Sequence, residues 1–187
     1  MGYYDHKRNV EKYVAMMSGF DNSALIEAVF NHLPAGKSML ELGMGAGLDF
    51  ALLKKAYTAT GSDSSKAFLD AYRKKDPSAS LLRLDAAKIE TDQIFDYIYS
   101  NKVLIHLTYE ALTASFKNQT ARLTSGGLVF HTFWYGTGSN HFNGLLFNNH
   151  TPEEIANISA PWFTPVCDVR YTEMDPDDSF YIVLKKK

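Results

Sequence analysis

Three glycines at alternate positions follow an acidic residue in the segment Glu41-Leu42-Gly43-Met44-Gly45-Ala46-Gly47. Glycine lets the backbone approach a ligand closely, and the first amides of a helix are free to donate hydrogen bonds. Residues 38–42 have the pattern of a short buried strand, and Leu48, Ala51 and Leu52 would lie on one face of a following helix. A strand, a glycine turn and a helix start together predict a site for a nucleotide-like ligand.

Two aspartates follow the next two predicted strands. Residues 57–61 and 81–84 read as strands, and Asp63 and Asp85 come at or just after their ends. Because the carboxyl ends of parallel strands meet at one edge of a sheet, we expect both carboxylates beside the glycine turn. Asp63, about twenty residues after the turn, stands where an acidic side chain can accept hydrogen bonds from both ribose hydroxyls.

These segments resemble the motifs of the class I S-adenosylmethionine-dependent methyltransferases. The similarity extends from about Leu33 to the end of the chain. The matching segments, in motif order, are residues 39–47, 60–65, 84–86 and 95–101, followed by 104–107 and 125–130.

The alternation of strands and helices predicts an α/β fold with a parallel sheet and helices on both faces. The resemblance makes this a Rossmann-like, doubly wound, mostly parallel seven-stranded sheet with an antiparallel C-terminal strand. Residues 166–171 and 179–184, joined by Asp175-Pro176-Asp177-Asp178, should form the hairpin that supplies this strand. We expect residues 1–187 to be a single domain, with residues 1–36 as a helical cap packed on it.

The resemblance also assigns roles to the residues of these motifs. Glu41 would hold the amino group of S-adenosylmethionine, Asp63 its ribose, and Asp85 its adenine. Ser100 and Asn101 would border the methyl-transfer site. The complete set of predicted cofactor-binding residues is Glu41, Gly43, Met44, Gly45, Gly47, Asp63, Ser64, Asp85, Ala86, Ser100 and Asn101.

Candidates for the acceptor side come from less specific signals. His106 follows the fourth strand and is the candidate for positioning the acceptor or moving a proton. The pocket candidates are Tyr3, Tyr4, His131, Trp134 and Tyr135. His131 also fits a packed polar role, and aromatic residues at helical spacing, such as Tyr13, are more often core. Residues 134–150, rich in Gly, Asn and Phe, are expected to form a long loop that shapes this pocket.

Composition narrows the class of protein and of partner. The 187 residues carry 19 Lys plus Arg and 21 Asp plus Glu, a formal charge of −2, which gives no reason to expect nucleic acid or a membrane. Cys167 is the only cysteine, and the six histidines form no metal-binding spacing, so no metal is expected. No signal-peptide pattern occurs, which predicts a cytoplasmic protein. Oligomeric state is not readable.

Absent motifs favour a small-molecule acceptor. No Asn-Pro-Pro-Tyr or Asp-Pro-Pro-Tyr follows the fourth strand, and no Pro-Cys pair occurs. Lys102 departs from the family pattern, which has a small or apolar residue there. Two alternatives stay open: a catalytically inactive S-adenosylmethionine-binding regulator or scaffold, and an NAD-binding oxidoreductase, although the third glycine comes one residue early for the dinucleotide motif.

Overall fold

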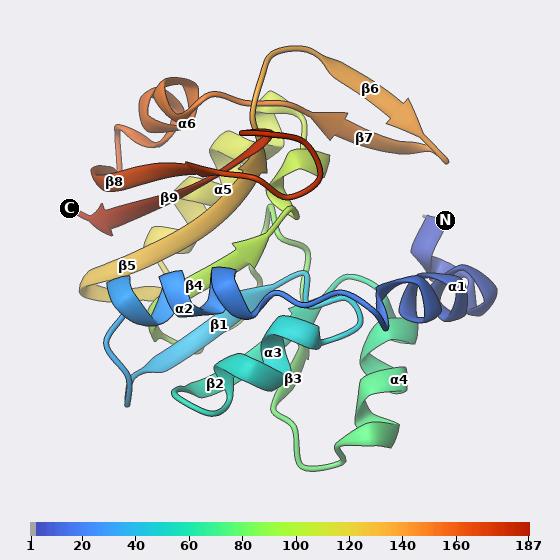
Figure 1. Ribbon diagram of the computed structural model, residues 1–187. Coiled ribbons are helices and arrows are strands. Elements are labelled where there is room, and N and C mark those ends of the chain that lie inside the picture. The colour runs from blue at the N-terminus through green and yellow to red at the C-terminus, as the bar shows by residue number, and fades with distance from the viewer. Residues whose placement is uncertain (1–2) are drawn as a thin grey trace.

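One seven-stranded sheet runs through the molecule in the order β3-β2-β1-β4-β5-β9-β8 (Figure 1). The computed structural model describes residues 3–187. The first five strands in this order are mutually parallel, and β9 is antiparallel to both β5 and β8. The strands are β1 (Ser38–Leu42), β2 (Thr58–Asp63), β3 (Leu81–Arg83), β4 (Phe95–Asn101), β5 (Leu123–Trp134), β8 (Phe163–Tyr171) and β9 (Ser179–Lys186). The predicted fold class is confirmed.

Helices cover both faces of this sheet. On one face the core contains α2 and α3, with α4 packed against α3, and on the other it contains α5 and α6. The helices are α1 (Lys7–Met17), α2 (Ser23–His32), α3 (Leu48–Leu53), α4 (Lys66–Lys75), α5 (Tyr109–Thr120) and α6 (Pro152–Ser159), with short 3-10 turns η1 (Tyr3–Asp5) and η2 (Leu104–His106). Within residues 3–187 no helix has the length and apolar character needed to cross a bilayer.

Side chains along β4 point alternately to the two faces of the sheet, and both of these faces are apolar. Ile98 points into the cluster with Leu112 and Phe116 of α5, whereas Tyr97 and Tyr99 point into the cluster with α2. A central parallel strand buried on both sides therefore reads as a nearly continuous apolar run. This burial fixes the register that brings the ends of β1, β2 and β4 to one edge.

A separate hairpin replaces the loop predicted for residues 134–150. Strands β6 (Ser139–Phe142) and β7 (Leu145–Asn148) pair antiparallel and project beyond the main sheet (Figure 1). Asn143 and Gly144 connect them with φ values of 53° and 76°. Asn-Gly favours such a two-residue turn because both positions need positive φ. The absence of long-range periodicity hid this short hairpin, and the prediction of an irregular loop was wrong.

The predicted C-terminal hairpin is present as β8 and β9. Its register places Ser179 opposite Trp134, so the connecting loop, residues 172–178, lies at the edge of the sheet where β4 also ends. Asp178 makes this loop rigid, since its carboxylate accepts hydrogen bonds from the backbone amides of Glu173, Met174 and Asp175 at 2.9–3.0 Å.

Substitution of Gly47 by alanine tests how tightly the glycine turn is packed. A Cβ atom there would lie 2.3 Å from the Tyr72 ring, whereas at Gly36, which also has positive φ, it would meet nothing within 4 Å. We expect Gly36→Ala to lower the free energy of unfolding by about 1–2 kcal/mol through backbone strain. Gly47→Ala should cost a further ~1–3 kcal/mol through overpacking. If urea unfolding shows the same loss of unfolding free energy for Gly36→Ala and Gly47→Ala, the close packing of Gly47 against Tyr72 would be contradicted.

Candidate active site

The glycine turn joins β1 to α3 with three left-handed residues. Gly43, Gly45 and Gly47 have φ values of 67°, 50° and 75°, which residues with a Cβ atom rarely adopt. A Cβ atom added to Gly43 would lie only 2.5 Å from Cγ2 of Val103, which is too close. The turn therefore needs glycine for both conformation and close packing. The structure supports the sequence argument for these positions.

A small hollow lies against this turn, and we call it the turn hollow. Its volume is about 60 Å³, well below the roughly 300–1,000 Å³ of a pocket that encloses a ligand. Tyr13 and Met17 of α1 are among its lining residues, so the N-terminal segment helps to narrow it. Its lining residues are Tyr13, Met17, Asn22, Glu41, Gly43, Met44, Gly45, Ala46, Leu48, Asp49 and Asn101.

Glu41 brings an uncompensated carboxyl group to the turn hollow. Its side chain is 4% exposed, and its Oε2 has no hydrogen-bond partner among the described residues. Burial, and then the charges of Asp49 and Asp63, raise the pKa of Glu41 well above its usual range. A buried oxygen without a partner is costly, so this position favours a ligand that donates hydrogen bonds or carries positive charge.

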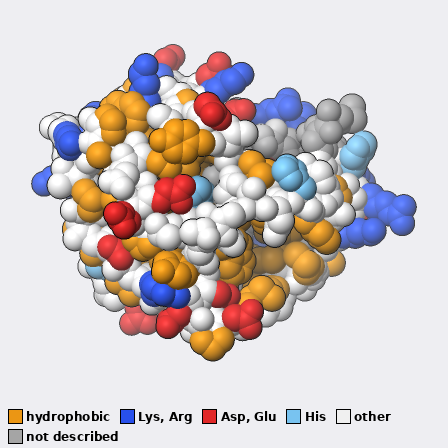
Figure 2. Space-filling view, turned by 90° about the horizontal axis from the view of Figure 1, so that it is seen from above, with side chains coloured by type: hydrophobic (Ala, Val, Ile, Leu, Met, Phe, Trp, Pro, Cys, Tyr) orange, Lys and Arg blue, Asp and Glu red, His pale blue; other side chains and the backbone are white. Residues whose placement is uncertain are grey.

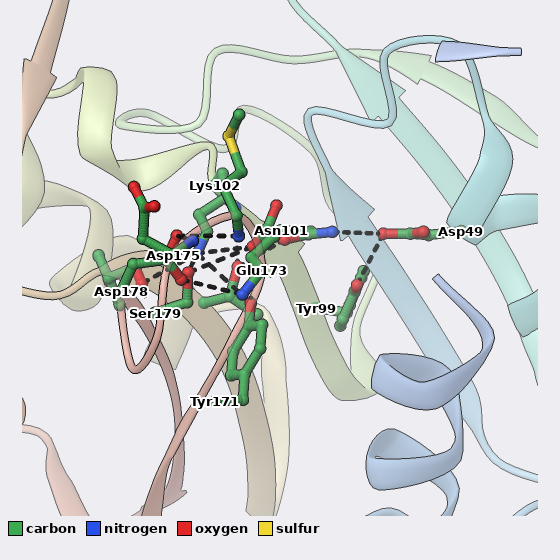
Figure 3. A network of polar contacts seen from close by, with 12 residues as sticks. Asp49, Tyr99, Asn101, Lys102, Tyr171, Glu173, Asp175, Asp178 and Ser179 are labelled. Atoms are coloured by element: carbon green, nitrogen blue, oxygen red, sulfur yellow. Dashed lines mark hydrogen bonds and ion pairs between the residues drawn. The ribbon is translucent and has the colours of Figure 1, made fainter. Parts of the chain in front are cut away.

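Asp49 lies at the centre of the site, although the sequence did not single it out. Its Oδ1 accepts a hydrogen bond from Asn22 at 2.7 Å. Its Oδ2 accepts from Tyr99 at 2.7 Å and Asn101 at 3.0 Å (Figure 3). An acidic residue in the first turn of a helix commonly compensates only the helix dipole. Here two donors from β4 and one from the start of α2 converge on it, which connects α3 to both elements.

Asp63 and Asp85 differ in their relation to the glycine turn. Asp63 is 8% exposed, and its carboxylate accepts from the amides of Gly45 at 3.0 Å and Ser65 at 2.8 Å. Burial raises the pKa of Asp63, while these two bonds lower it. Asp85 is exposed and accepts from the amide of Ala87 at 2.7 Å. The structure therefore brings Asp63 directly to the turn and leaves Asp85 at the periphery.

Two of the other predicted cofactor residues, Ser64 and Ala86, are accessible to solvent. Ser64 is exposed and Ala86 half-buried. Met44 is buried, and its sulfur lies 2.6 Å from where a Cβ of Gly61 would be, so this side chain packs inward. Met44 also lines the turn hollow, and its backbone amide donates to Ser62 O at 2.8 Å.

Tyr3 and Tyr4 lie beside the end of β2. Ser65 Oγ donates to Tyr4 O at 2.6 Å, and the Tyr4 ring packs against Tyr13 and Phe68. Tyr4 is close enough to Asp63 for that carboxylate to contribute to a raised pKa of the Tyr4 phenol, after burial and the neighbouring Tyr3. Tyr4 therefore lies near Asp63, with the Tyr3 ring packed against the Tyr4 ring.

His131 and Ser100 were predicted near the acceptor and cofactor, but the structure places both inside the core. Both have 0% exposure. His131 Nδ1 lies 2.8 Å from Ser100 Oγ, and Nε2 lies 2.9 Å from Gln119 Oε1. Burial lowers the pKa of His131 to about 3, so the imidazole is neutral. This pair is an internal polar contact between β4, β5 and α5, and its prediction as a pocket wall was wrong.

The remaining acceptor candidates lie around the β6–β7 hairpin and the end of β5. His106 is half-buried, with Nδ1 2.6 Å from Leu146 O and its ring against Phe147. Burial lowers the pKa of His106, which favours a neutral ring. The Trp134 ring lies under the Lys102 ammonium, and the Tyr135 ring lies under Arg170. None of these three residues lines the turn hollow.

A larger open groove of about 350 Å³ lies elsewhere, at the first turns of α5 and α6. Tyr109, Glu153 and Asn157 are among its lining residues. It contains none of the residues predicted for the site. We therefore place the site at the turn hollow, where the chemistry-bearing residues converge.

Comparison with known proteins agrees with this geometry. Residues 39–127 match the methyltransferase domain family. No match to this sequence is found among curated proteins. Many solved structures share the fold, among them the following three. The PH0226 protein from Pyrococcus horikoshii OT3 superposes with a TM-score of 0.76 at 16% identity, covering 89% of each chain.

The second structure is the N-methyltransferase NodS from Bradyrhizobium japonicum WM9 in complex with S-adenosylhomocysteine. It has a TM-score of 0.74 and 16% identity, covering 96% of this chain and 97% of NodS. The third is the 1,6-didemethyltoxoflavin-N1-methyltransferase of Burkholderia thailandensis, with a TM-score of 0.75 and 19% identity, covering 98% of this chain and 83% of the other. The domain match over residues 39–127 and the shared fold support the S-adenosylmethionine-dependent methyltransferase class predicted from the motifs.

The buried state of His131 predicts a specific dependence of stability on pH. An unfolded histidine has a pKa of about 6.5, and the folded value is about 3. Between these values the unfolded chain binds the extra proton, so the free energy of unfolding falls as pH decreases from about 6.5 toward 3. His131→Gln should flatten the slope between about pH 5 and 6.5 in urea unfolding.

This variant should also lose about 2–4 kcal/mol at neutral pH, because Ser100 and Gln119 lose their shared partner and a cavity opens. His141, which is exposed, provides the control through His141→Gln. An unchanged slope in His131→Gln, or an equal change in the control, would show that His131 is not the titrating group.

Proposed function

We propose that the protein transfers a methyl group from S-adenosylmethionine to a small-molecule acceptor. The observation that carries the proposal is the buried, unpartnered Glu41 Oε2 at the turn hollow. The cofactor has an amino group that can supply the missing hydrogen bonds and positive charge. NodS and the toxoflavin N1-methyltransferase, both solved with S-adenosylhomocysteine, support this choice of cofactor.

The residues present fit the cofactor at three points. Glu41 would bind its amino group, and the left-handed turn of Gly43, Gly45 and Gly47 would admit its chain beside bare backbone. Asp63 would exchange its hydrogen bonds to Gly45 and Ser65 for the ribose hydroxyls. Asp85 and the Ala86 amide remain candidates for the adenine, at the accessible end of the site.

The chemistry requires little from the protein beyond alignment. The bound cofactor supplies a methyl group that its sulfonium already activates. This chain must hold the acceptor in line with that group and exclude water. Asn101, fixed by Asp49 and Thr132, would border the reacting atoms, and the aromatic N-terminal segment would cover them. His106, with Nδ1 directed at Leu146 O, keeps Nε2 as a candidate proton acceptor.

The toxoflavin enzyme, which was solved with its small-molecule substrate, supports an acceptor of this class. The methyltransferase domain match favours methyl transfer over the nicotinamide-dependent alternative. Formation of S-adenosylhomocysteine in pools of metabolites tests turnover. Tight cofactor binding without turnover in any pool would favour a regulatory binding protein instead.

Glu41→Gln tests the cofactor contact directly. Because the pKa of Glu41 is raised, its carboxyl must lose a proton to pair with the cofactor's ammonium, so affinity for S-adenosylhomocysteine should rise with pH. Calorimetry in two buffers of different ionisation enthalpy should show proton release for the wild type. In Glu41→Gln this release should disappear and the dissociation constant should rise by about 10- to 100-fold.

Glu27 is exposed on α2, and Glu27→Gln is the matched control. It should keep both proton release and affinity. Proton release that persists in Glu41→Gln would assign the ionisation to another residue and remove the main support for the proposal.

The different exposure of Asp63 and Asp85 predicts unequal effects. Asp63→Ala should weaken S-adenosylhomocysteine binding by more than about 1 kcal/mol, the loss expected for hydrogen bonds to a charged acceptor. Asp85→Ala should weaken it less, because water already solvates that carboxylate. Unchanged affinity in a folded Asp63→Ala variant would contradict its role at the ribose.

A further inference from the structure

A largely buried lysine follows Asn101 at the end of β4. Only 12% of the Lys102 side chain is exposed, and its φ is +54°, an uncommon value for a residue with a Cβ atom. Its amide donates to Thr132 Oγ1 at 2.9 Å. The side chain extends across β5 toward β9 and the 172–178 loop (Figure 3).

The Lys102 ammonium has a partner within the protein for each of its three N–H donors. Nζ lies 3.0 Å from Phe133 O, 2.7 Å from Ser179 Oγ and 3.0 Å from the Glu173 carboxylate. It also lies 4.0 Å from the centre of the Trp134 ring, in a cation–π contact. Since an ammonium has three N–H donors, none is left for a ligand. Lys102 therefore serves to hold Glu173.

Glu173 is a fixed carboxylate with one available oxygen. Its Oε2 accepts from Lys102, from Tyr171 at 3.2 Å and from Ser179 at 3.4 Å. Across residues 3–187 no hydrogen bond reaches Oε1, and 29% of the side chain is exposed. The loop that carries Glu173 is held by three backbone hydrogen bonds to Asp178. This combination presents a preorganised hydrogen-bond acceptor to the outside.

Glu173 is connected to the proposed active site through Lys102, which follows Asn101 in the chain. Thr132 donates to Asn101 Oδ1 at 2.6 Å, and Asn101 in turn contacts Asp49, which lines the turn hollow (Figure 3). The charge of Glu173 also reaches Tyr13 over the hollow. It contributes, after burial and nearer groups, to a pKa of Tyr13 raised to about 12. A molecule beside Asn101 would therefore be within reach of Glu173.

The charge around this position selects among acceptors. Glu41, Asp49 and Asp63 are all carboxyl groups at the glycine turn, and Lys102 is already paired with Glu173. Figure 2 shows acidic side chains on the face that carries the 172–178 loop, with Lys and Arg mainly toward its margin. Anionic acceptors would be repelled. A neutral amine attacks through its own lone pair, whereas an alcohol would depend on a proton acceptor such as His106 before it could react.

We propose that Glu173, positioned by Lys102, binds the methyl acceptor and that this acceptor is an amine. The inference rests on the proposed methyl transfer and adds the substrate class. Glu173 Oε1 would accept a hydrogen bond from the amine N–H and leave the lone pair free to point at the methyl group. The nitrogen forms the new N–C bond, the methyl–sulfur bond breaks with its electron pair on sulfur, and one N–H proton leaves to water.

The test uses the full chain with S-adenosylmethionine and matched sets of small amines, alcohols, phenols, thiols and carboxylic acids. Mass spectrometry detects the methylated products. We expect products from amines only. In Glu173→Gln the KM for the best amine should rise at least about tenfold, while the KM for S-adenosylmethionine and the affinity for S-adenosylhomocysteine stay within about twofold.

Two further variants separate recognition from folding. Asp177→Asn, in the same loop, is the matched control and should keep the KM for the amine. The double variant Lys102→Met/Glu173→Gln removes both charges together, so it should fold without an unpaired ammonium and still show the raised KM.

Products from another acceptor class, no methylated amine, or an unchanged KM in Glu173→Gln would overturn the inference. In those cases retained S-adenosylhomocysteine binding, with turnover of a different acceptor, would leave the proposed function standing. Loss of cofactor binding in the wild type would instead refute the proposed function itself.

Discussion

The site depends on the burial of three carboxyl groups around one glycine turn. Asp49 and Asp63 are compensated by hydrogen bonds, from Asn22, Tyr99 and Asn101 in one case and from backbone amides in the other. Glu41 has no such compensation at Oε2, and burial together with its two acidic neighbours raises its pKa. The raised pKa favours the protonated carboxyl, and a cationic ligand group would favour the carboxylate instead.

The sheet is what makes this arrangement possible. Parallel strands buried on both faces bring the ends of β1, β2 and β4 to one edge, and the antiparallel β9 brings the 172–178 loop to the same edge. From there a chain of polar contacts connects Asp49 through Asn101 and Thr132 to Lys102. The proposed cofactor and acceptor sides are thus connected through rigid strand ends, which suits a reaction that depends on alignment.

The sequence predicted those parts of the site whose backbone requirements are local. Alternating glycines reveal a left-handed turn, and aspartates near strand ends follow from the strand pattern, so Gly43 and Asp63 could be found. Side-chain direction is different. Ser100 and His131 occupy strand ends as expected, but packing against Gln119 turns them inward, which no one-dimensional pattern shows. Asp49 and Tyr13 gain their importance from partners distant in sequence. The Asn143-Gly144 pair is a local signal for a two-residue hairpin turn, which a pattern of long-range periodicity does not reveal.

The most direct test of the account is a crystal structure of the protein with S-adenosylhomocysteine. The account predicts the amino nitrogen of the ligand within hydrogen-bond distance of Glu41 Oε2, its ribose on Asp63, and Tyr13 displaced from its present position over the glycine turn. Ligand bound away from the turn, with Glu41 Oε2 still unpartnered and Tyr13 unmoved, would contradict it.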